Sequence, residues 1–141
     1  MFRETARGLL QTHCPPGAVR AAWREASGRV PGLWSRLAEI GVVGLTVPEA
    51  LGGLGMGELD LVLILEEAGR AAAPEPLVET IAVGAPLLRD AGTAALREAW
   101  LPRVAAGEAV LAVGLDGAPH VAFAAEADRS EERRVGKECL E

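Results

Sequence analysis

The feature that most constrains the fold of this chain is a succession of apolar stripes with helical spacing, separated by proline and glycine. The first stripe comprises Phe2, Ala6, Leu9 and Leu10. A break at residues 15–17 follows, and a short helical stretch is then expected from Val19 to Ala26. Pro31 suits the first turn of a third helix, which Gly41 would end. The first forty residues are therefore predicted to be helical with short breaks.

The helical pattern continues through the middle of the chain. Nearly every residue from Leu59 to Leu65 is apolar, which predicts a buried central helix without a wide solvent face. After two prolines, a helical segment runs through residues 77–88, and Thr93 can cap the next helix. Residues 109–115 are short, apolar and partly β-branched, which predicts a strand. The predicted fold class is an all-α helical bundle with one or two short β-segments after residue 108.

Composition excludes several functions. The 141 residues suffice for one core, and half of them are hydrophobic. A net charge of −6 and the absence of tyrosine argue against a nucleic-acid partner. No apolar run is long enough for membrane insertion. The two cysteines, Cys14 and Cys139, are far apart and outside any metal-ligand spacing, so we expect a reduced, cytoplasmic protein with no metal site.

A glycine-rich stretch, VPEALGGLGMG at residues 47–57, lies between two apolar segments. This order of elements is found in phosphate-binding loops, but the dinucleotide spacing G-x-G-x-x-G would require glycine where Glu58 stands. No lysine of a P-loop follows, and Glu49 and Glu58 would repel a pyrophosphate. The alternative is a tight connection between helices, in which Gly53 or Gly55 adopts a positive φ. We favour that alternative.

Two stretches in order along the chain carry a family resemblance. Residues 37–70, LAEIGVVGLTVPEALGGLGMGELDLVLILEEAGR, resemble the N-terminal helical domain of the flavin-dependent acyl-CoA dehydrogenases. In that family a helix ending in L-A-E-x-G leads through G-L-x-V-P-E-x-x-G-G-x-G into a helix closing with E-E-x-G-R. The later LPRVAAGEAV, residues 101–110, is similar to the family pattern L-P-x-x-A-x-G-E. The resemblance covers roughly residues 1–115.

The resemblance implies a domain organisation. Residues 1–108 would form the N-terminal helical domain, and residues 109–128 would begin a truncated middle β-domain. Residues 129–141, which read RSEERRVGKECLE, are highly charged and have almost no apolar pattern. We expect that tail to be solvated or foreign sequence. The chain is thus expected to be the N-terminal part of a larger enzyme.

The resemblance also implies an activity. Members of the family desaturate an acyl-CoA thioester between its α and β carbons, in fatty acid or steroid degradation. A glutamate base removes the α-proton while N5 of FAD accepts the β-hydride, and electron-transferring flavoprotein is the usual acceptor. The base and most of the flavin site belong to domains beyond this one. No catalytic, cofactor-binding or metal-binding residue is therefore predicted here, and FAD is not expected to bind this chain alone. The full-length protein would form a homo- or hetero-oligomer.

A substrate-binding segment is predicted at residues 75–85, EPLVETIAVGA, where small residues leave room beside a helix. In the family the matching segment borders the cavity for the acyl tail. On that resemblance the predicted wall residues are Leu77, Val78, Glu79 and Ala82. Close helix packing without a ligand is the alternative for each of them.

One departure from the family pattern favours a second function. Flavin-binding members continue after the strand into a T-E-x-x-x-G-S-D turn, whereas residues 114–128 read GLDGAPHVAFAAEAD, without the serine or threonine. Actinobacterial subunits of heteromeric acyl-CoA or steroid-CoA dehydrogenases are degenerate at the same turn. The alternative function is therefore a non-catalytic helical assembly domain of such a subunit.

Glu66 and Glu67 fit intrahelical pairing with Arg70 better than a role as general base.

Overall fold

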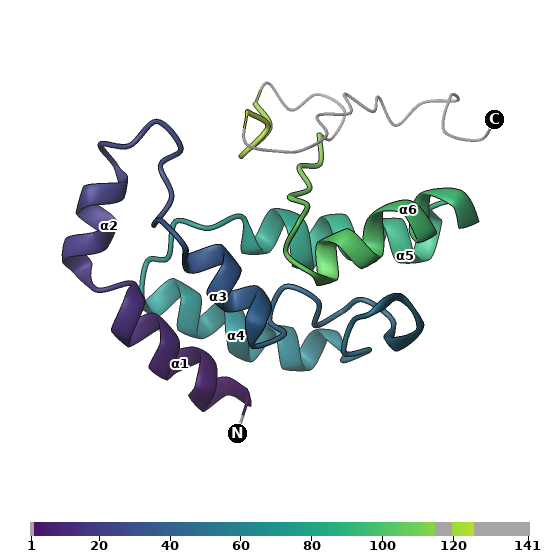
Figure 1. Ribbon diagram of the computed structural model, residues 1–141, viewed down its shortest axis with the longest axis horizontal. Helices are drawn as coiled ribbons and strands as arrows, with labels where there is room; N and C mark the ends of the chain where they lie inside the picture. The colour runs from purple at the N-terminus through teal and green to yellow at the C-terminus, as the bar shows by residue number, and fades with distance from the viewer. Residues whose placement is uncertain (1, 115–119, 126–141) are drawn as a thin grey trace.

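The computed structural model describes residues 2–114 and 120–125, and within them the fold is helical with no sheet, as predicted. The elements are α1 (Phe2–His13), α2 (Pro16–Ala22), α3 (Leu33–Glu39), the 3₁₀ turn η1 (Glu49–Leu51), α4 (Glu58–Arg70), the π-helix η2 (Val78–Gly84), α5 (Ala85–Ala91) and α6 (Ala94–Ala105). Helices α1, α3 and α4 form one group, and α5 packs against both η2 and α6 in a second (Figure 1). No helix of the described residues is both long and apolar enough to cross a membrane.

The core joins these two groups. Its largest fully buried side chains include Leu10, Leu33, Leu37, Leu45, Ile64, Ile81 and Leu101. The apolar run at residues 42–47 is also buried, but it forms successive turns between α3 and η1 instead of a strand. Burial without a neighbouring strand is possible there because the chain's own turn hydrogen bonds pair its backbone groups.

Several predicted helix ends are confirmed. The Thr93 hydroxyl accepts a hydrogen bond from the Leu96 backbone N–H at 3.3 Å, so it is the N-cap of α6. Gly41 follows α3 with a φ of +81° and turns the chain away from the helix axis. The second helix differs: α2 begins at Pro16 and ends at Ala22, earlier than the predicted Val19–Ala26. Proline at the first helical turn needs no N–H partner, which favours the earlier start.

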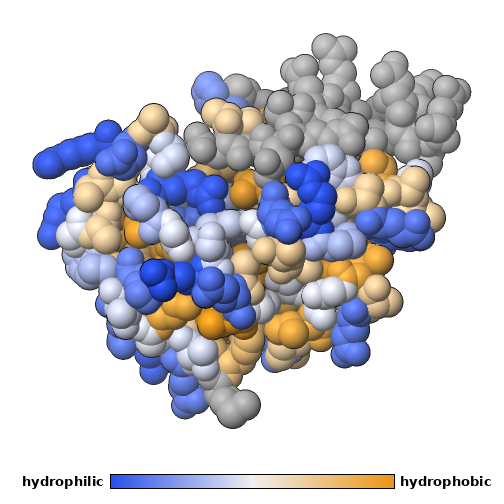
Figure 2. All heavy atoms as spheres, in the orientation of Figure 1, coloured by the Kyte–Doolittle hydropathy of each residue, from blue (hydrophilic) through white to orange (hydrophobic). Residues whose placement is uncertain are grey.

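The predicted burial of α4 is wrong. Leu59 is 85% exposed, Val62 is 58% exposed and Leu63 is 41% exposed. The side chains that face the core are instead Leu61, Ile64, Glu67 and Ala68. A helix of period 3.6 has room for only one core-facing stripe, so a continuous apolar run places the remaining apolar residues outside it. The viewed surface in Figure 2 accordingly shows hydrophobic side chains interspersed with hydrophilic ones.

The segment after α6 is extended but scarcely regular. Ala109, Val110 and Leu111 are buried, Leu111 takes part in a β-bridge, and residues 112–114 belong to no regular element. The predicted strand is thus reduced to one bridging residue among the described part of residues 109–115. The predictions for residues 115–119 and for the charged tail at 129–141 fall outside the described residues.

Candidate functional site

The glycine-rich loop is a folded turn whose amides are already used. The backbone N–H groups of Leu54, Gly55 and Met56 donate to the carbonyl oxygens of Gly44, Val47 and Leu45, respectively, at 2.9–3.0 Å. Gly55 has the predicted positive φ, at +60°. Gly53 does not, but a Cβ there would lie 2.1 Å from the Val47 carbonyl oxygen. The loop therefore packs against residues 44–47, and these amides do not point at a phosphate.

The four predicted wall residues lie on or beside η2, in different surroundings. Leu77 precedes the π-helix and is buried in the core, with 2% of its surface exposed. Val78 is 52% exposed, and Glu79 and Ala82 are partly buried. The structure thus places Val78 at the surface and Leu77 in the core, with Glu79 partly covered and Ala82 partly covered against the core.

An apolar surface extends beyond these residues. Val83 and Leu87 are 40% and 48% exposed and lie four residues apart, across the junction of η2 and α5. Together with Val78 they give this helical segment an apolar outer side. Large exposed apolar surfaces on a soluble protein are typical of binding sites. The periodicity predicted a helix here but not a π-helix, whose wider turn places residues five apart on one side.

Two buried threonines hold η2 in place. The Thr80 hydroxyl donates to the Leu111 carbonyl oxygen and accepts from the Leu111 N–H, both at 3.1 Å. The Thr46 hydroxyl donates to the Ile81 carbonyl oxygen at 3.0 Å. Gly84 permits the close approach on the same side, because a Cβ there would lie 2.8 Å from the Leu111 Cβ. The wall segment and residues 109–111 are therefore joined closely, which no local sequence pattern indicates.

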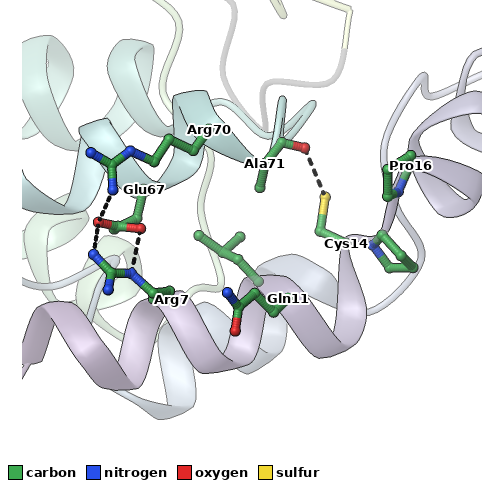
Figure 3. Close-up of a pocket in the computed structure, with 9 residues that line it drawn as sticks. Arg7, Gln11, Cys14, Pro16, Glu67, Arg70 and Ala71 are labelled. Carbon is green, nitrogen blue, oxygen red and sulfur yellow. Dashed lines mark hydrogen bonds and ion pairs between the residues drawn. The ribbon is translucent and has the colours of Figure 1, made fainter.

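A groove of about 530 Å³ lies between α1 and the last turn of α4, and none of its lining residues belongs to η2. Figure 3 shows the side chains of Arg7 and Arg70 reaching the Glu67 carboxylate at one end, and Cys14 and Pro16 at the other. Arg7 binds both carboxylate oxygens, at 2.8 and 2.9 Å, and Arg3 donates to one of them at 2.7 Å. The predicted pairing of Glu66 and Glu67 with Arg70 is present, but α1 supplies the stronger contacts to Glu67. This cluster fastens α1 to α4.

The chemistry of the groove does not support catalysis. Hydrogen bonds from Arg7 and Arg3 lower the pKa of Glu67 from 4.5 to about 2, so this carboxylate is a poor proton acceptor at neutral pH. Burial raises the pKa of the Cys14 thiol, which disfavours the nucleophilic thiolate. No cluster of metal-binding side chains occurs among the residues that the structure describes.

The Glu67 cluster gives an acid-stability prediction. Because its pKa is lower in the folded state, Glu67 contributes stability fully above about pH 4.5, and that contribution is lost as the pH falls toward 2. Urea unfolding of the parent and of Glu67→Gln, each at pH 7 and at pH 3, measures this contribution to the free energy of unfolding. We expect the stability difference between the two proteins to shrink markedly at pH 3. An equal difference at both pH values would contradict the role assigned to the ionised carboxylate.

Residues 1–108 match the family described as acyl-CoA dehydrogenase, N-terminal domain. The chain belongs to the acyl-CoA dehydrogenase family. It is 42% identical over 100 residues to acyl-CoA dehydrogenase IpdE2 of Mycolicibacterium smegmatis, covering 70% of this chain and 32% of that protein. It is 41% identical over 118 residues to IpdE2 of Mycobacterium tuberculosis, covering 82% of this chain and 36% of that protein.

Solved dehydrogenase structures share the arrangement of helices. A variant of the steroid ACAD Tcur3481–Tcur3483 aligns with a TM-score of 0.71 and 38% identity, over 75% of this chain and 29% of that chain. The ChsE4–ChsE5 complex of Mycobacterium tuberculosis aligns with a TM-score of 0.72 and 25% identity, over 77% of this chain and 30% of that chain. The chain thus spans about a third of the length of these relatives.

Proposed function

We propose that this chain is the N-terminal helical part of an FAD-dependent acyl-CoA dehydrogenase that desaturates an acyl-CoA thioester. The observation that carries the proposal is the family match over residues 1–108. The role of these residues would be to bind and orient the substrate, since the part of the chain that the structure describes offers no activated base or nucleophile. FAD, when bound by the rest of the enzyme, would accept the hydride.

The apolar outer side of η2 supports a substrate-binding role. Val78 and Ala82 would contact the acyl tail, and Glu79 would lie at the border of that contact. Leu77 would not touch the substrate. It would support the wall indirectly, because it packs in the core and fixes the start of the π-helix. The hydrogen bonds of Thr80 to Leu111 would keep this wall at a constant distance from the segment leading into the next domain. A fixed wall favours a reactive alignment of the thioester.

A second candidate function is a non-catalytic assembly domain in a heteromeric dehydrogenase. Two observations favour it. The structural relatives include the ChsE4–ChsE5 complex, and residues 114–128 lack the hydroxyl side chains of the family's flavin turn. In this case the partner subunit would supply FAD and the catalytic base, and electron-transferring flavoprotein would accept electrons from that partner.

A dehydrogenation assay tests the proposal. The protein is expressed with the coding sequence that adjoins it, and acyl-CoA thioesters of several lengths are supplied with an artificial electron acceptor. We expect a yellow protein whose flavin absorbance falls when substrate is added anaerobically. The matched control is the 141-residue chain alone, which should be colourless and inactive. A flavin-free, inactive long form would contradict the catalytic proposal and favour the assembly function.

A further inference from the structure

The first two turns of α4 present an apolar ridge to solvent. Leu59, Val62 and Leu63 stand at positions i, i+3 and i+4, so their side chains are neighbours on one side of the helix. They are 85%, 58% and 41% exposed. The opposite side of the same helix already packs on the core through Leu61 and Ile64. The ridge therefore makes no contribution to the core of this domain.

Acidic side chains surround this ridge. Glu58 and Asp60 flank Leu59 on either side, both exposed, and Glu66 lies one turn further along. Arg89 reaches Glu58 at 3.3 Å, whereas both Arg3 and Arg70 reach Glu66. Arg89 also binds Asp90 at 2.7 Å, and Arg70 also binds Glu67 at 3.3 Å, so each is shared between two carboxylates. The ridge is thus apolar, and its rim is negative at the end where Glu58 and Asp60 lie, while the charge of Glu66 is offset by two arginines.

The charge of the rim argues against a second copy of this chain as the occupant. A symmetric pair would place the same surface patch on itself, and the carboxylates of each copy would then approach those of the other. Like charges brought together at an interface are unfavourable. A partner surface with basic side chains at its edges would instead complement Glu58 and Asp60.

We propose that the α4 ridge, defined as Leu59, Val62 and Leu63, docks against a helix whose apolar stripe is flanked by lysine or arginine. Ridges of residues three and four apart on one helix fit the grooves of another, which suits a helical occupant. The apolar side chains would supply the binding free energy, and the acidic rim would select the basic flanks. This inference is independent of the proposed dehydrogenase activity and needs neither FAD nor thioester.

Synthetic helical peptides test the proposal on the chain as it is. One labelled peptide carries a leucine stripe flanked by lysines, and the second has glutamates in place of the lysines. A third has the lysine composition with a scrambled stripe, which controls for general attraction to the net charge of −6. Fluorescence anisotropy should show the first peptide binding at least about tenfold more tightly than either other peptide.

Variants locate the binding surface. The double variant Leu59→Gln with Leu63→Gln, and separately Val62→Gln, should weaken binding of the lysine peptide by roughly tenfold or more. Both alter exposed helical positions, and their circular dichroism should match the parent. Trp23→Gln, at the end of α2 and 70% exposed, lies outside both apolar surfaces; it is the control and should bind like the parent. Equal affinity for the lysine and glutamate peptides, or unchanged binding by the α4 variants, would overturn the proposal. So would a dimer in sedimentation that the α4 variants abolish.

Discussion

Replacing Gly53 with alanine is expected to destabilise the protein by roughly 3 kcal/mol. The added Cβ would lie 2.1 Å from the Val47 carbonyl oxygen and 2.6 Å from the Gly44 carbonyl oxygen, and both are backbone atoms that cannot rotate away. Relieving the overlap would separate the glycine loop from residues 44–47. Thermal unfolding should show a midpoint lower by about 10 °C for a domain of this size.

The control for this prediction is Gly69→Ala, which makes the same chemical change inside α4. Apart from the adjoining residues and backbone of α4 itself, nothing lies within 4 Å of a Cβ built at Gly69, so alanine should leave stability unchanged or raise it slightly. Both variants are also measured with FAD and with acyl-CoA. A Gly53→Ala protein that melts like the parent, but loses a ligand-induced shift that the parent shows, would refute the structural role of the loop.

Thr80→Val is expected to have the second large effect, a loss of roughly 2–4 kcal/mol. Valine nearly preserves the shape of the side chain but removes the hydroxyl that bonds both the N–H and the carbonyl oxygen of Leu111. Thr80 is fully buried, so water does not readily replace those bonds. Urea unfolding monitored by tryptophan fluorescence provides the measurement.

The companion variant Thr80→Ser distinguishes the contribution of the hydroxyl to stability from that of the methyl group. Serine keeps the hydroxyl and deletes one buried methyl, which should cost about 1 kcal/mol. A larger loss for serine than for valine would mean that packing, and not the pair of hydrogen bonds, joins η2 to residues 109–111.

The sequence predicts features that depend on local chemistry. The Thr93 cap, the end of α3 at Gly41 and the positive φ of Gly55 each follow from one residue type at one position. Gly53 does lie in a tight turn, as the sequence predicts. Glycine is required there because a Cβ would overlap the backbone of residues 44–47, and not because of a positive φ. A close approach between segments depends on tertiary packing, so the sequence could not distinguish it from a special φ.

Features that depend on neighbouring elements were harder to predict. The apolar run of α4 indicated burial, but how much of a helix is covered depends on how many elements pack around it. The pairing of Glu67 with Arg3 and Arg7 joins residues about sixty positions apart. Among the predicted wall residues, Leu77 is buried just before η2 while Val78 is exposed, a difference that hydrophobic periodicity does not resolve.

Because Cys14 is buried, the reactivity of its thiol reports how often α1 separates from α4. Its Sγ lies 3.9 Å from the Ala71 carbonyl oxygen, and only 2% of the residue is exposed. Although Cys14 lies at the end of the groove, so little of it is exposed that a thiol reagent reacts readily only after the two helices part. In a Cys139→Ser background, the rate of labelling would then equal the intrinsic thiol rate multiplied by the fraction of molecules momentarily open. One cysteine thus converts a static helix contact into a measurable opening equilibrium, without an added probe.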